Sequence, residues 1–130
     1  MDLETVMEAA RAASERAYAP YSDFHVGAAI LTAGGKIYQG SNIENASYGL
    51  SVCAERNAAT TMAFADPEDR AIEVVAVYSR NTSPCFPCGA CRQFLREFGC
   101  KEVVVDDGSG LLRRYPFEEI LPNSFGPEDL

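Results

Sequence analysis

The feature that most constrains the fold is a pair of short cysteine segments that lie far apart in the chain. The first is Cys53-Ala54-Glu55, and the second runs from Pro87 to Cys91 and contains a Cys-x-x-Cys pair. Together they supply three thiolate ligands and one carboxylate, the components of a hydrolytic zinc site. A fold that uses them must bring both segments to one place.

Each segment is predicted to lie where a loop enters a helix. The Ala-rich stretch 53–64 predicts one helix, and Gly89 to Phe98 predicts another that ends at Gly99. Helix N-termini carry unpaired N–H groups and partial positive charge, which favour a thiolate over a thiol. Two such helices side by side on one face of a sheet would bring their N-termini together.

Helix and strand patterns alternate along the rest of the chain. Leu3 to Ala17 has apolar residues near helical period and predicts an opening helix that ends before Pro20. Strands are predicted over residues 24–32, 36–41, 72–78, 102–105 and 111–115, with a hairpin turn at Gly34-Gly35 and a short helix over 117–121. This alternation predicts an α/β layered sheet.

Composition narrows the class of protein. The chain has 130 residues with 47% hydrophobic content, enough for a single domain spanning 1–130 with one core. A net charge of -8 opposes binding to nucleic acid, so a free small molecule is the expected substrate. No apolar run is long enough to cross a bilayer, and no secretion signal is seen, so the expected location is the cytoplasm.

The number and spacing of the cysteines favour metal binding over disulfides. Five cysteines is an odd count, and reduced thiols with a tight Cys-x-x-Cys pair are typical of a metal site. Zinc is preferred because this borderline-soft ion suits sulfur and needs no redox partner. Cys85, Cys100 and the single histidine, His25, have no assigned role, and His25 is a poor ligand candidate at the start of a strand.

The residues next to Cys53 have the chemistry that a three-sulfur site needs. Three protein ligands leave a position for a water, and Glu55 is the expected proton carrier. Three thiolates weaken the acidifying power of zinc unless a donor withdraws charge from sulfur, and Arg56 is placed to do so. Taken alone, Glu55 is also consistent with a carboxylate that stabilises a helix start.

These residues belong to a longer pattern of motifs that covers nearly the whole chain. The motifs, in order, are Pro20-Tyr21-Ser22 with Phe24, Val26-Gly27-Ala28, Asn42 to Leu50, Cys53 to Arg56, Pro87 to Gln93, Leu121-Pro122 and Phe125-Gly126. The pattern closely resembles the cytidine deaminase family, and specifically its small, homotetrameric branch with only cysteine ligands. The resemblance implies a three-layer α/β fold with a mixed sheet of about five strands flanked by helices.

The resemblance also implies an activity. It implies hydrolytic deamination of cytidine and 2′-deoxycytidine to uridine and 2′-deoxyuridine, with release of ammonia, as in pyrimidine salvage. One Zn²⁺ per subunit would be held by Cys53, Cys88 and Cys91, and would activate the water that adds to C4 of the base. Glu55 would move protons to N3 and then to the departing ammonia. The preference between ribose and deoxyribose is not fixed by these residue types.

Further residues would contact the substrate in this family pattern. Asn42 and Glu44 would bind the ribose hydroxyls, because residues at alternate positions of one extended segment can face the same sugar. Phe24 would stack on the base, and Ala54 would help through its backbone. Tyr48 and Phe125 would reach into the site of a neighbouring subunit, so the homotetramer would be functional.

Three rival interpretations use the same cysteines. A blasticidin S deaminase shares the cysteine segments, although Asn42 to Leu50 resembles the nucleoside enzymes better. A nucleic-acid editing deaminase is disfavoured by the acidic charge and by the lack of a basic, aromatic pattern. A zinc-stabilised binding module would need a fourth ligand, for which Cys85 is the nearby candidate.

Overall fold

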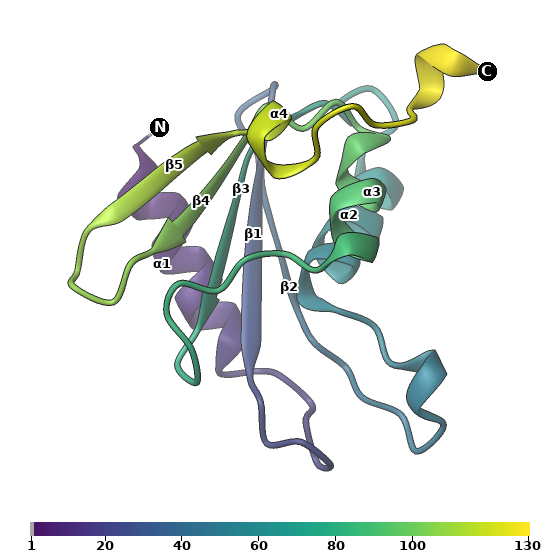
Figure 1. Cartoon of the computed structure of the whole chain (residues 1–130). Helices are drawn as coiled ribbons and strands as arrows, with labels where there is room; N and C mark the ends of the chain where they lie inside the picture. The colour runs from purple at the N-terminus through teal and green to yellow at the C-terminus, as the bar shows by residue number, and fades with distance from the viewer. Residues whose placement is uncertain (1) are drawn as a thin grey trace.

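A five-stranded mixed sheet forms the centre of the computed structural model, which describes residues 2–130 (Figure 1). The strands are β1 (Val26–Thr32), β2 (Ile37–Ser41), β3 (Ile72–Ser79), β4 (Glu102–Asp106) and β5 (Leu112–Pro116). Their order is β2-β1-β3-β4-β5, and β3 and β4 are parallel while the other neighbours are antiparallel. The parallel pair requires a crossover, and α3 supplies it.

Helices cover both faces of this sheet. The helices are α1 (Leu3–Ser14), α2 (Ala54–Ala65), α3 (Gly89–Arg96) and the short α4 (Phe117–Ile120). In Figure 1, α1 lies on one face, and α2 and α3 lie together on the other. The predicted three-layer α/β fold with a mixed sheet is therefore confirmed. No helix within residues 2–130 combines the length and the apolar character needed to cross a membrane.

Alternation along the strands divides the interior into two cores. Ala28 and Ile30 of β1 pack in a core with α2 and α3, whereas Ala29 between them packs in a second core with α1. Successive side chains of a strand point to opposite faces, so a strand buried on both faces must be apolar throughout. This requirement explains the continuous apolar runs that predicted β1 and β3.

Gly40 in β2 allows α2 to lie directly on the sheet. A Cβ atom at Gly40 would lie 2.4 Å from the backbone nitrogen of Ala58 and 2.5 Å from the carbonyl oxygen of Ala54. Both atoms belong to the backbone of the first turns of α2, which cannot move aside as a flexible side chain could. The absence of a side chain at Gly40 therefore sets the distance between β2 and the N-terminal end of α2, where Cys53 and Glu55 lie.

The structure adjusts several predicted boundaries by a few residues. The opening helix ends at Ser14 instead of Ala17, because Tyr18 pairs with Ile43 in an isolated bridge. The first strand begins at Val26, so Phe24 lies outside it. Two short 3₁₀ helices, Tyr48–Leu50 and Pro127–Asp129, were not predicted.

Substitution of Gly40 by Ala is expected to destabilise the protein. The new methyl group would push α2 away from β2, which should lower the free energy of unfolding by about 1–3 kcal/mol. Denaturant unfolding measures this change. Gly49→Ala is the matched control, because a Cβ atom there meets nothing within 4 Å. Equal stability of the two variants would contradict the close approach of α2.

Candidate active site

Three cysteine sulfurs meet where α2 and α3 begin. Cys53 immediately precedes α2, Cys88 immediately precedes α3, and Cys91 lies in the first turn of α3. Their sulfur atoms all lie within 4.8 Å of one another, and those of Cys53 and Cys88 are 3.9 Å apart. The structure therefore brings together the two cysteine segments that lie far apart in the sequence.

This cluster fits a single zinc ion. Zn–S bonds of about 2.3 Å in tetrahedral geometry place two sulfurs about 3.8 Å apart, which is close to the separation of Cys53 and Cys88. Among residues 2–130, Cys85 is not a member of the group. The cluster therefore offers three sulfur atoms, and a tetrahedral ion held by them would keep one position open.

Hydrogen bonds and charge favour the anionic form of Cys53. The pKa of Cys53 is lowered to about 5 by a hydrogen bond from Cys91 and by the neighbouring Arg56, while the pKa of Cys91 is raised by the same pairing and by burial. Arg56 Nη2 lies 3.6 Å from Cys53 Sγ and donates to it. Arg56 is thus placed to withdraw charge from a sulfur ligand.

Glu55 lies beside the sulfurs and is almost completely buried. Glu55 is 4% exposed, and burial raises the pKa of its carboxyl group to about 7. A carboxyl group in that range can both accept and release a proton near neutral pH. The start of α2 therefore places the Cys53 sulfur and a buried carboxyl group that can exchange protons two residues apart.

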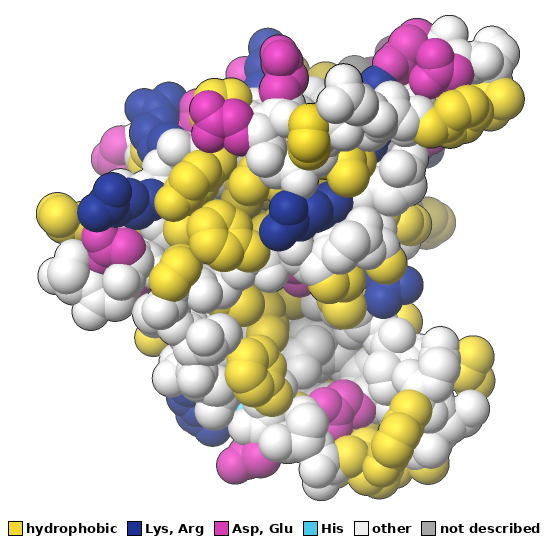
Figure 2. Space-filling view, viewed as in Figure 1, with side chains coloured by type: hydrophobic (Ala, Val, Ile, Leu, Met, Phe, Trp, Pro, Cys, Tyr) yellow, Lys and Arg dark blue, Asp and Glu magenta, His cyan; other side chains and the backbone are white. Residues whose placement is uncertain are grey.

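A cavity of about 270 Å³ opens onto this cluster. Its lining residues are Ser22, Phe24, Val26, Asn42, Glu44, Cys53, Ala54, Glu55, Cys85, Phe86 and Cys88. Figure 2 shows a hollow on this side of the molecule, bordered by hydrophobic side chains and an acidic group. A larger cavity of about 640 Å³ between the end of α3 and α4 contains none of the three clustered thiols, so chemistry and not size identifies the candidate site.

The cavity unites most of the residues singled out from the sequence. Phe24, Asn42, Glu44 and Ala54 line it together with Glu55. Cys85 and Phe86 also line it, a position that the sequence pattern did not indicate because they precede the Pro-Cys-Gly motif.

Two predicted residues lie elsewhere in the same chain. Tyr48 is 73% exposed and lines a second, neighbouring cavity together with Tyr21. Ser22 and Glu44 line both this second cavity and the main one. Phe125 is 59% exposed in the C-terminal segment. Neither side chain lines the cavity of its own chain.

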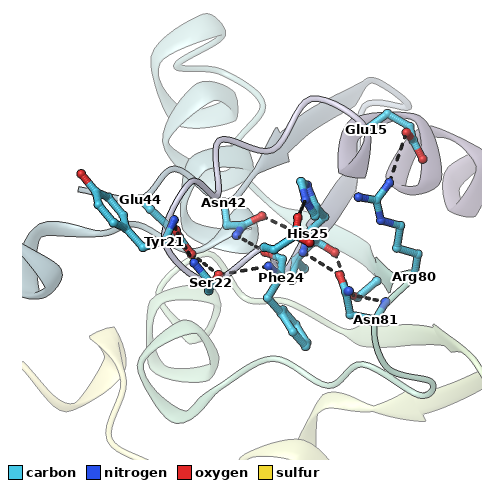
Figure 3. Close-up of polar contacts among 12 residues, drawn as sticks. Glu15, Tyr21, Ser22, Phe24, His25, Asn42, Glu44, Arg80 and Asn81 are labelled. Atoms are coloured by element: carbon cyan, nitrogen blue, oxygen red, sulfur yellow. Dashed lines mark hydrogen bonds and ion pairs between the residues drawn. The ribbon is translucent and has the colours of Figure 1, made fainter. Parts of the chain in front are cut away.

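Asn42 and Glu44 also hold the loop that carries Phe24 (Figure 3). Asn42 Oδ1 accepts a hydrogen bond from Val26 N at 2.8 Å, and its Nδ2 donates to the carbonyl of Phe24 at 2.7 Å. The Glu44 carboxylate accepts hydrogen bonds from the backbone of Tyr21 and from the backbone and hydroxyl of Ser22. These bonds, chiefly the one from the Ser22 hydroxyl, lower the pKa of Glu44, so it stays ionised.

Comparison with known proteins agrees with this geometry. The family model of the cytidine and deoxycytidylate deaminase zinc-binding region matches residues 1–106. A cytidine deaminase from Sporosarcina psychrophila is 41% identical over 134 residues, covering 100% of this chain and 96% of that protein. The crystal structure of a cytidine deaminase from Burkholderia pseudomallei matches with a TM-score of 0.86 and 45% identity, covering 96% of this chain and 100% of that one. The structure of the Mycobacterium tuberculosis cytidine deaminase gives a TM-score of 0.83 at 35% identity, covering 97% of this chain and 98% of that one. This chain therefore belongs to the cytidine and deoxycytidylate deaminase family.

Proposed function

We propose that this protein is a zinc-dependent cytidine deaminase. It hydrolyses cytidine and 2′-deoxycytidine to uridine and 2′-deoxyuridine and releases ammonia. The observation that carries this assignment is one cavity lined by two of the three clustered cysteines, a buried carboxylate and the polar residues expected to contact a sugar. Full-length relatives named as cytidine deaminases support it.

Cys53, Cys88 and Cys91 are the proposed zinc ligands, with one ion in each subunit. Zinc bound there would act as a Lewis acid that lowers the pKa of a water molecule. Arg56 tunes the site by donating to the Cys53 sulfur, which reduces the negative charge that the three thiolates bring to the ion.

Glu55 is the proposed proton carrier. It takes a proton from the water that attacks C4 and delivers it to N3 of the base. It then takes the proton of the hydroxyl formed at C4 and gives it to the amine, so that the C4–N bond breaks, ammonia leaves and C4 becomes a carbonyl. Burial beside the sulfurs raises the pKa of Glu55 to about 7, which suits a group that must both take and give protons. Its place in the first turn of α2 holds it next to Cys53.

The opposite end of the cavity is proposed to bind the nucleoside. Phe24 packs on the base, Ala54 contacts it through its backbone, and Asn42 and Glu44 bind the ribose hydroxyls. Nδ2 of Asn42 uses one N–H for the Phe24 carbonyl and keeps a second N–H for a hydroxyl. Glu44 is ionised and can accept a hydrogen bond from a hydroxyl group.

A homotetramer is proposed as the active form, with the whole chain, 1–130, as one deaminase domain in each subunit. Tyr48, Phe64 and Phe125 are 73%, 90% and 59% exposed, and aromatic side chains exposed to this extent are typical of surfaces that pack against a partner. Tyr48 and Phe125 would complete the sites of neighbouring subunits. Five free cysteines are consistent with a reducing compartment, so we place the enzyme in the cytoplasm, in pyrimidine salvage.

Replacement of Glu55 by Gln should abolish deamination while zinc stays bound. The amide keeps the size of the side chain but cannot carry protons, so the turnover of cytidine should fall by at least about 10²- to 10⁴-fold. Loss of the cytidine absorbance band measures turnover, and metal analysis of the same sample gives the zinc content. A zinc-loaded wild type that leaves cytidine and deoxycytidine unchanged would refute the assignment.

Replacement of Cys85 by Ser should leave one zinc per chain, because Cys85 lies outside the sulfur cluster. Cys91→Ser, which removes a proposed ligand, should lower the zinc content in the same metal analysis. Release of zinc from the Cys85→Ser variant would instead favour a closed site with four cysteine ligands and no water, as in a structural zinc module.

Mixed oligomers test whether neighbouring chains complete each site. A Phe125→Ala chain co-expressed with a Glu55→Gln chain should be more active than the sum of the two variants alone. The reason is that some mixed sites would combine Glu55 of one chain with Phe125 of its neighbour. Activity no higher than that sum, measured by cytidine absorbance on the purified mixture, would show that Phe125 does not act on a neighbouring site.

A further inference from the structure

The segment Phe24 to Val26 is held in place by a set of side chains where strand pairing begins. Phe24 and His25 precede β1, and Val26 is its first residue, paired with Ser79 of β3 but not with β2. Each backbone polar group from the Phe24 nitrogen to the Val26 nitrogen forms a hydrogen bond with a side chain. We call the four residues that supply these side chains the frame: Ser22, Asn42, Ser79 and Asn81.

The frame forms hydrogen bonds with the segment from two sides. On the β2 side, Asn42 bonds to both Phe24 and Val26. On the β3 side, Ser79 Oγ donates to the carbonyl of His25 at 2.6 Å, and Asn81 Oδ1 accepts from the backbone nitrogen of His25 at 2.8 Å. Figure 3 shows Asn42 and Asn81 on opposite sides of this segment.

Asn81 is itself fixed to the centre of the sheet. Its backbone N–H donates to Ser79 Oγ at 3.1 Å, and Ser79 is the last residue of β3 and is buried. Asn81 therefore connects a central strand to the segment that carries Phe24. The sequence motifs gave Asn81 no role.

The Phe24 side chain is partly exposed, and the residue before it has an unusual backbone conformation. Phe24 is 39% exposed, and Asp23 before it has a φ of 55°, in the left-handed region that is unfavourable for most residues. A chain in such a conformation returns to a more ordinary one when the contacts that enforce it are removed. Asp23 is held by the bond from its N–H to the carbonyl of Ala19, at 3.0 Å, and by a 2.9 Å contact of its carboxylate with His25 Nε2, while the frame fixes the residues that follow it.

We propose that Asn81 is a positioning residue for the nucleoside site, acting through the Phe24 backbone. This role rests on the proposed function, because it assumes that Phe24 packs on the base of the substrate. Asn81 does not line the cavity. Its effect on the substrate is transmitted through the His25 amide to the neighbouring Phe24 ring.

Substitution Asn81→Ala removes the acceptor of the His25 N–H. We expect it to raise the KM for cytidine by about 3- to 10-fold, the range that corresponds to one hydrogen bond. The value of kcat should change less, because packing of Phe24 on the base is present in both the ground state and the transition state. Asn81→Asp retains an acceptor oxygen and should restore a KM close to that of the wild type.

Coupling to Phe24 separates this role from a general loss of stability. In a Phe24→Ala background, Asn81→Ala should have no further effect on KM, since the ring that it positions is gone. Arg80→Gln is the matched control on the same segment, because Arg80 contributes none of the hydrogen bonds of the frame and its ion pair with the exposed Glu15 is long, at 3.9 Å. That variant should keep the wild-type KM.

Amide hydrogen exchange provides a readout that does not depend on turnover. The amide of His25 should exchange faster in Asn81→Ala than in the wild type, and Asn81→Asp should protect it again. An unchanged KM, an equal effect of Asn81→Ala with and without Phe24, or unchanged exchange at His25 would each overturn the proposal. A wild type inactive on cytidine but with faster exchange in Asn81→Ala would refute the proposed function while retaining the positioning of the segment by Asn81.

Discussion

The close approach of three cysteine sulfurs is the constraint on which the site depends. The sulfurs of Cys53, Cys88 and Cys91 lie within 4.8 Å of one another, so three thiolates there would repel one another unless a cation lay between them. The two helix N-termini supply part of the positive potential, and Arg56 adds a full charge beside Cys53. Zinc would complete this balance and bind α2 to α3.

That arrangement is possible only because of how the sheet is built. The parallel pairing of β3 and β4 makes α3 a crossover helix, so α3 lies on the same face as α2. Gly40 lets α2 contact β2 through its backbone. The proposed ligands are therefore placed by backbone packing, while the end of the cavity proposed to bind the nucleoside is placed by side-chain hydrogen bonds.

Local patterns in the sequence were sufficient to predict most of the fold. Buried strands such as β3 are continuously apolar, and α2 is Ala-rich after a cysteine at the helix start. The helix α3 ends at Arg96, two residues before Phe98, the predicted end. The residues around Cys53 and Cys88 were recognisable because their chemistry is concentrated in short segments.

Contacts between distant segments had no such local signal. The predicted strand began at Phe24, but regular pairing starts at Val26 because Asn42 and Asn81 take the place of strand partners. Neither the exposure of Tyr48 nor the position of Cys85 on the cavity wall follows from its neighbours in sequence.

The frame around Phe24 has a consequence for how this family can diversify. A cavity wall that is held by the backbone hydrogen bonds of a sheet changes shape only when a whole strand moves, and such a movement disturbs both hydrophobic cores. A wall held by four separate side chains can be reshaped by single substitutions at Ser22, Asn42, Ser79 or Asn81, because β1 and β3 keep their own pairing. One end of the cavity can therefore be altered by single substitutions while the arrangement of the sulfurs at the other end stays unchanged.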